Sequence, residues 1–148
     1  MDRLTSAYPI FAERLRSVSV ARVRAVAVEA CNYAFKRNDA SDPTVASALE
    51  ALNRGARISA AQEKTLSELV ESLDERYFMA CEASSEEVDT PSEYLLLFSQ
   101  ARAVSAISFA LRSEFLESNA DAIYEASMAI ESPEELLDMI EIHLIKAD

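Results

Sequence analysis

The chain contains a single glycine, Gly55, among its 148 residues. Hairpins, barrels and sandwiches need glycine in their tight turns, so the sequence argues against these β folds. Neither GxGxxG nor GxxxxGK[ST], the glycine-rich phosphate-binding loops, can be written with one glycine. Half of the residues are apolar, which is enough material for a hydrophobic core. We therefore expect one all-helical domain spanning residues 1–148.

Helix start signals recur along the chain. Asp42-Pro43 places a capping acid before a proline at the first helical position, and Gly55 lies where a left-handed residue would close that helix. Three capping boxes, in which Gln or Glu follows a hydroxyl residue by three positions, occupy residues 59–62, 90–93 and 132–135. These signals predict an all-α protein, a single compact bundle of six or seven helices with short loops.

Two segments determine how such a bundle would be built. Residues 18–28 are rich in Val and partly alternate, which would suit a strand, but an apolar face of helical spacing continues through Ala30, so we expect a helix. Residues 91–117 are the most apolar segment, and their many Ala and Ser side chains allow close approach of neighbours. We expect this segment to be the central helix, followed by a helix capped at Ser118 or Asn119.

The sequence shows no targeting or membrane-spanning segment. Residues 1–6 lack a basic region followed by an apolar one. The longest purely apolar run, residues 94–98, is far shorter than the ~18 residues of a membrane span. Cys31 and Cys81 are isolated, and two buried thiols are favoured over one disulfide. We expect a cytoplasmic protein that does not enter the membrane.

His143 is the only histidine, and this limits the chemistry available to the chain. Neither the Glu-x-x-His pairs of a di-iron site nor the HExxH motif of a zinc protease is present. No serine lies in a GxSxG motif, and a thiol on an apolar helix face is poorly ionised. We expect no metal, no cofactor and no enzyme activity. The enzyme alternative is a pair of carboxylates that act as acid and base in a deep pocket.

The net charge of −12 is unevenly distributed. Residues 1–58 carry nine basic and six acidic side chains, whereas residues 59–148 carry five basic and twenty acidic ones. In the second part the carboxylates recur at helical spacing in three rows: Glu68, Glu71 and Glu75 with Asp74 and Glu82 nearby; Glu114, Glu117, Asp121 and Glu125; and Glu131, Glu134, Glu135, Asp138 and Glu141. The rows are either solvated faces that keep the protein soluble or a face for a basic partner protein. Their charge would repel phosphate, which argues against direct nucleic-acid binding.

The first sixty residues resemble a known family. The stretch Val28-Glu29-Ala30-Cys31 is followed by Asp42-Pro43, then by the Ala-rich helix at residues 48–52, and closes at Arg54-Gly55. This order is similar to that in the small acidic all-helical immunity proteins of bacterial polymorphic toxin systems. The resemblance implies that the chain binds and blocks a cognate toxin domain, and it carries over no catalytic residue.

Our leading hypothesis is a cytoplasmic immunity-type inhibitor that occludes a toxin domain with an acidic helical face. The partner would be a protein toxin with a basic surface. The residues expected to contact it are Glu71, Asp74, Glu75, Glu114, Glu117, Asp121 and Glu125, with Tyr77 and Tyr124 as aromatic anchors. One alternative is a helical adaptor or dimerisation module, marked by an exposed apolar patch on the helix that starts at Pro91. Another is a phage-type anti-defence inhibitor that mimics nucleic acid.

Overall fold

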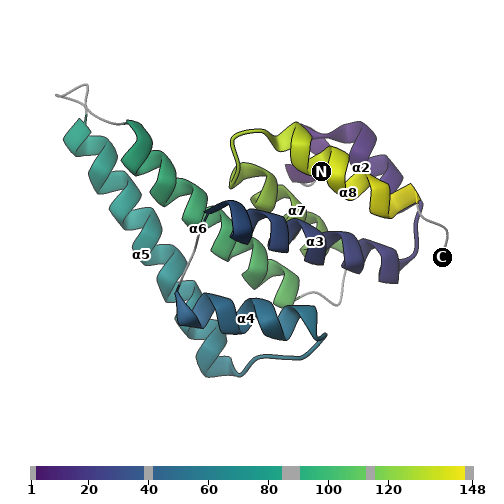
Figure 1. Ribbon diagram of the computed structural model, residues 1–148, viewed down its shortest axis with the longest axis horizontal. Helices are drawn as coiled ribbons and strands as arrows, with labels where there is room; N and C mark the ends of the chain where they lie inside the picture. The colour runs from purple at the N-terminus through teal and green to yellow at the C-terminus, as the bar shows by residue number, and fades with distance from the viewer. Residues whose placement is uncertain (1–2, 39–41, 85–90, 113–115, 146–148) are drawn as a thin grey trace.

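The computed structural model describes residues 3–38, 42–84, 91–112 and 116–145, which form eight helices and no strand (Figure 1). In chain order these are α1 (Arg3–Ala7), α2 (Pro9–Arg16), α3 (Val20–Asn38), α4 (Pro43–Asn53), α5 (Ala60–Ser84), α6 (Pro91–Leu111), α7 (Leu116–Met128) and α8 (Pro133–Ile145). The all-α prediction is confirmed, and the helix count exceeds the predicted six or seven. The short α1 has five residues and one buried side chain, Leu4, which is too little to show a helical period.

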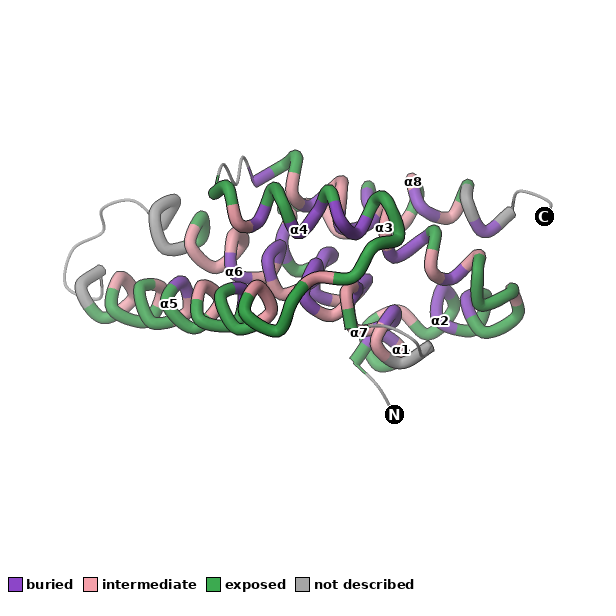
Figure 2. The backbone as a smooth tube through the Cα atoms, turned by 90° about the horizontal axis from the view of Figure 1, so that it is seen from below, coloured by how far each residue is buried: buried purple, intermediate pink, exposed green. Residues whose placement is uncertain are grey.

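Helix α6 is the centre of the packing. It contacts α3, α4, α5 and α7, while α8 packs on α3 and contacts α2. Helices α5 and α6 run antiparallel as a long hairpin, and the far end of this hairpin projects beyond the other helices in Figure 1. Figure 2 shows that buried residues gather in α3, α6 and α7, whereas α5 is exposed along much of its length. The outer side of the hairpin is therefore open to solvent.

The small side chains of α6 explain its central place. Ala101, Ala103, Ala106 and Ala110 are each at most 1% exposed. Side chains of this size let the neighbouring helices approach the α6 backbone closely. The prediction of a central helix is confirmed, although α6 ends at Leu111 rather than near residue 117.

The predicted helix signals are found at their expected places. The Asp42 carboxylate accepts a hydrogen bond from the Thr44 N–H at 2.8 Å, and Gly55 has a φ of 68° just after α4. The Ser59 N–H donates to the Gln62 side chain at 3.0 Å, and the Gln62 N–H donates to the Ser59 hydroxyl at 3.1 Å. This reciprocal pair is the predicted capping box at the start of α5.

The other two boxes are described only in part. Helix α6 begins at Pro91 and α8 begins at Pro133, as the sequence predicts. Thr90 of the second box lies outside the described residues. In the third box the Glu135 N–H donates to the carbonyl oxygen of Ser132 at 3.1 Å.

Two boundaries needed the structure to settle them. Residues from Val20 onward form α3, so the Val-rich segment is helical, as expected. The predicted cap at Ser118 or Asn119 is wrong, because α7 already begins at Leu116. Asn119 is only 2% exposed and its side chain is packed inside the bundle instead of closing a helix end.

No helix among the described residues has the length and apolar character needed to cross a membrane.

A larger side chain at the packed face of α6 should destabilise the fold. We expect Ala106→Leu to lower the free energy of unfolding by about 1–3 kcal/mol, because the buried face has no space for three more carbons. The control is Ala46→Leu at an exposed position of α4, which should change it by less than about 0.5 kcal/mol. Urea denaturation followed by circular dichroism measures both, and equal effects would contradict close packing at α6.

Candidate protein-binding surface

Arg102 of α6 bridges carboxylates from two other helices. Its Nη2 donates to both carboxylate oxygens of Asp74 in α5, each at 3.0 Å, and its Nη1 donates to Glu125 Oε2 in α7 at 3.1 Å. The Arg102 side chain is 18% exposed and that of Glu125 is 3% exposed. Charge-assisted bonds in such a shielded place are stronger than at the surface. The three residues tie α5, α6 and α7 together.

Arg3 of α1 extends this ion network. Its Nη1 donates to Glu125 Oε1 at 2.9 Å, and its Nη2 lies 3.5 Å from Asp121 Oδ1. Its guanidinium also lies over the ring of Tyr124, 4.7 Å from the ring centre. Burial lowers the pKa of Arg3, but hydrogen bonds and charge attraction from Glu125 and Asp121 outweigh it, so the net pKa is raised. We call Arg3, Asp74, Arg102, Asp121 and Glu125 the ion network.

The second carboxylate row is therefore not the exposed face that the sequence predicts. Glu125 is buried and paired with two arginines, so its expected place on the surface is wrong. Asp121 pairs with Arg3, and Tyr124 lies under the same guanidinium. Glu117 belongs to α7, although its side chain is not among those described, and Glu114 lies outside the described residues. The physical reason is the place of α7, which packs against α3 and α6.

The first row does form an exposed face. Glu68, Glu71 and Glu75 are exposed and follow one another by three and four positions along α5. Helix α5 packs chiefly on α6 and touches α4, so these three exposed carboxylates lie on its outer side. Asp74, one position before Glu75, turns inward to Arg102. We call Glu68, Glu71 and Glu75 the acidic ridge; within the described residues, Glu68 is the one member that forms an ion pair, with Lys64 at 4.0 Å.

The aromatic residue exposed beside the ridge is Phe78. Its ring is 5.4 Å from that of Tyr77, which in turn is 5.4 Å from Phe98 of α6. Tyr77 is half-buried, whereas Phe78 is 63% exposed. The sequence prediction chose Tyr77 as an anchor and missed Phe78. The signal was present, because Phe78 follows Glu75 by three positions and so continues the outer face of the helix.

Large apolar side chains are also exposed around the far end of the hairpin. Phe78 and Met79 lie in α5, and Leu95 and Leu96 lie in α6. All four are more than half exposed. We call these four residues the apolar tip. Surface residues of this size in one region are typical of contact sites with other proteins.

The remaining candidate groups for chemistry are the two cysteines and His143; Cys31 is buried as expected, whereas Cys81 of α5 is only half-buried. Both cysteines are free thiols, and burial raises the pKa of Cys31 to about 12. A thiol with so high a pKa is protonated at neutral pH and is a poor nucleophile. His143 lies in the last turn of α8. Among the described residues, no group of three or more His, Cys, Asp or Glu side chains could hold a metal ion.

Removal of the central cation should strongly destabilise the bundle. We expect Arg102→Met to lower the free energy of unfolding by about 1.5–3 kcal/mol, because Asp74 would lose its cation and the buried Glu125 would keep only Arg3. Lys64→Met removes an exposed partner of Glu68 and should cost less than about 1 kcal/mol. Chemical denaturation measures both. A similar small loss in the two variants would show that the network does not hold α5, α6 and α7 together.

Comparisons with protein-family models, with curated proteins and with solved structures found no match for this chain. The resemblance of its first sixty residues to immunity proteins therefore stays a prediction. What the chain does has to be inferred from its own surfaces: the acidic ridge, the apolar tip and the ion network that supports them.

Proposed function

We propose that the chain is a cytoplasmic, non-catalytic inhibitor of the immunity type, which binds a cognate toxin domain with a basic surface. The observation that carries this proposal is the acidic ridge of α5, three exposed carboxylates in one row that continues into the exposed ring of Phe78. Binding would occlude the active site of the toxin domain or the path of its substrate.

The ridge and Phe78 have complementary parts in such binding. Aligned carboxylates attract a basic partner over a distance and raise the rate of association, and they disfavour acidic partners. An aromatic side chain that enters a pocket of the partner supplies much of the binding energy and slows dissociation. Both kinds of group lie on the same outer side of α5.

The ion network fixes the inner side of α5, the helix that carries the ridge. Asp74 lies between Glu71 and Glu75 in the sequence, and its carboxylate is held by two hydrogen bonds from Arg102. The ring of Tyr77 packs between those of Phe78 and Phe98 and so restricts the position of Phe78. A surface that is already ordered loses less conformational entropy when it binds a partner. Asp74 and Tyr77, chosen from the sequence as contacts, thus act in this proposal by positioning their exposed neighbours.

The proposal is tested with the C-terminal domain of the protein encoded directly upstream of this chain. That domain should arrest growth of a bacterial host when it is expressed alone, and co-expression of this chain should restore growth. A domain that is harmless, or one that this chain neither binds nor neutralises, would overturn the immunity role.

Charge reversal along the ridge should slow association with that domain. We expect the variant Glu68→Lys, Glu71→Lys, Glu75→Lys to lower the association rate at least about tenfold at low salt. The matched control reverses three exposed carboxylates of other helices, Glu13, Glu50 and Asp138, which gives the same change in net charge. Surface plasmon resonance gives the rates, and circular dichroism verifies the fold. If both variants associate equally slowly, the association rate depends on the net charge of the chain and not on the position of the ridge.

A second candidate function is a helical adaptor or dimerisation module, and the apolar tip favours it. Under our proposal, light scattering after size exclusion should give the monomer mass of 16.3 kDa, because a net charge of −12 opposes self-association. A dimer that Phe78→Ser disperses and Ile142→Ser, at another exposed apolar position, leaves intact would favour the adaptor.

The nucleic-acid mimic has less support. It would need several rows of exposed carboxylates. Within the described residues, the second row has Glu125 buried and Asp121 paired with Arg3, and the third row has Glu135 paired with Arg37 and Glu141 paired with Arg14.

A further inference from the structure

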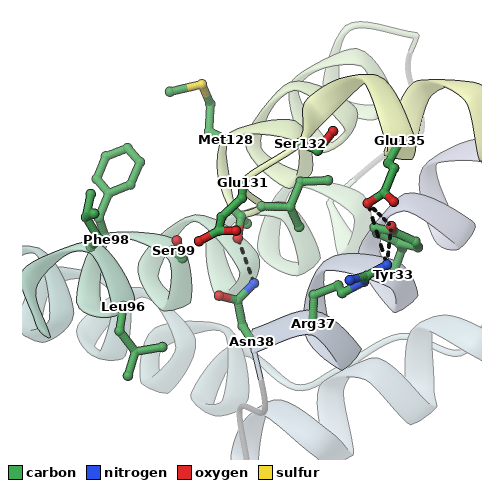
Figure 3. Close-up of a pocket in the computed structure, with 13 residues that line it drawn as sticks. Tyr33, Arg37, Asn38, Leu96, Phe98, Ser99, Met128, Glu131, Ser132 and Glu135 are labelled. Carbon is green, nitrogen blue, oxygen red and sulfur yellow. Dashed lines mark hydrogen bonds and ion pairs between the residues drawn. The ribbon is translucent and has the colours of Figure 1, made fainter. Parts of the chain in front are cut away.

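A groove lies between the end of α3, the first half of α6 and the turn that joins α7 to α8 (Figure 3). Its volume is about 700 Å³. Apolar side chains from two helices and the turn line it: Leu96, Phe98, Met128 and Ile130. Among the described side chains, none of α5 lines the groove, so it is a different surface from the acidic ridge.

Asn38 lines the groove, and its side-chain oxygen Oδ1 accepts no hydrogen bond from a described residue. The residue is 6% exposed, and its Nδ2 donates to the carbonyl oxygens of Ala34 and Ala129, both at 2.8 Å. These two bonds use both N–H groups of the amide. No described residue donates to its Oδ1, and Figure 3 shows this oxygen on the side of the amide that faces α6. An amide oxygen that reaches the groove and accepts from no described residue is open to a hydrogen bond from a ligand.

Glu131 supplies a second acceptor. It is exposed in the turn between α7 and α8, lines the groove, and has no ion pair with a described residue. Glu135 differs, because its carboxylate lies 3.6 Å from Arg37 Nη2 and 3.3 Å from the Tyr33 hydroxyl. Arg37 is thereby engaged with Glu135 and Tyr33. The groove thus offers an uncompensated carboxylate and an amide oxygen, both of which only accept hydrogen bonds.

A ligand that suits these acceptors carries several N–H donors and a positive charge. The guanidinium of arginine has five such donors in a planar fork and pairs well with carboxylates. The apolar lining suits neighbouring aliphatic side chains. A second copy of this chain is disfavoured as the occupant, because each copy has a net charge of −12.

We propose that the groove binds a segment of a partner protein in which an arginine is flanked by aliphatic residues. The arginine pairs with Glu131 and donates to Asn38 Oδ1, and the aliphatic residues pack on Leu96, Phe98 and Met128. This inference does not depend on the acidic ridge or on the immunity role, since it uses other residues.

The probe is the acetylated, amidated peptide Gly-Leu-Arg-Leu-Ser, titrated into the ¹⁵N-labelled full chain and followed by NMR. We expect saturable shifts at the amides of Asn38, Ser99 and Glu131. Replacement of the peptide arginine by citrulline keeps its shape and removes its charge, and should weaken binding at least about fivefold. Glu131→Gln should weaken the arginine peptide similarly, whereas Glu134→Gln, at an exposed position of α8, should leave it unchanged.

A second pair of variants tests the apolar part. Leu96→Ser should weaken the peptide, whereas Ile142→Ser should not; both positions are more than half exposed, so neither change should unfold the chain. Shifts outside the groove, or equal binding of the citrulline peptide, would overturn the proposal. So would equal binding of N-acetylarginine amide, which lacks the aliphatic residues, or the same shifts on concentrating the protein alone, which would indicate a second copy as the occupant.

Discussion

The contact on which the remaining structure depends is that of Arg102 with Asp74 and Glu125. Arg102 is the only basic residue of α6, and it receives one carboxylate from each of the two helices that pack most extensively on α6. A buried ion pair is not a strong source of stability compared with apolar packing, but an unpaired member is very costly. The network therefore disfavours any arrangement of α5, α6 and α7 that separates these three side chains.

This constraint divides the described carboxylates of α5 and α7 into two groups. Carboxylates that face α6, such as Asp74 and Glu125, are neutralised by arginines and hold helices together. Carboxylates on the outer side of α5 stay in solvent, where their mutual repulsion is tolerated because the helix is fixed on its inner side. The net charge of −12 is consequently not spread as a uniform surface field. Its accessible, oriented part in α5 is the acidic ridge.

The local features of the fold were predictable from the sequence, and the long-range ones were not. Asp42, Ser59 and Gly55 act through bonds to residues a few positions away, so their spacing alone predicted where helices begin and end. Helical spacing also placed Asp121 and Glu125 on one face, but it could not show which helix would cover that face. The pairing of Glu125 with Arg3 joins residues 122 positions apart, and no local pattern contains it.

The same limit explains why Phe78 and the groove were missed. A period of 3.6 residues identifies an apolar stripe, and the natural expectation is that such a stripe is buried. At the far end of the hairpin, α5 and α6 cover one another only on their facing sides, so Phe78 and Leu96 stay exposed. The groove needs three separate segments, and Asn38 has its role there only because the turn after α7 comes to lie beside it.

The two proposed binding surfaces are joined by a continuous row of aromatic contacts. Phe78 packs on Tyr77, Tyr77 packs on Phe98, and the guanidinium of Arg102 lies 5.7 Å from the centre of the Phe98 ring. Phe98 also lines the groove. An occupant that displaces this ring would disturb both the support of Phe78 and the surroundings of Arg102. Phe98 is thus the side chain that the groove shares with the contacts that position Phe78 and surround Arg102.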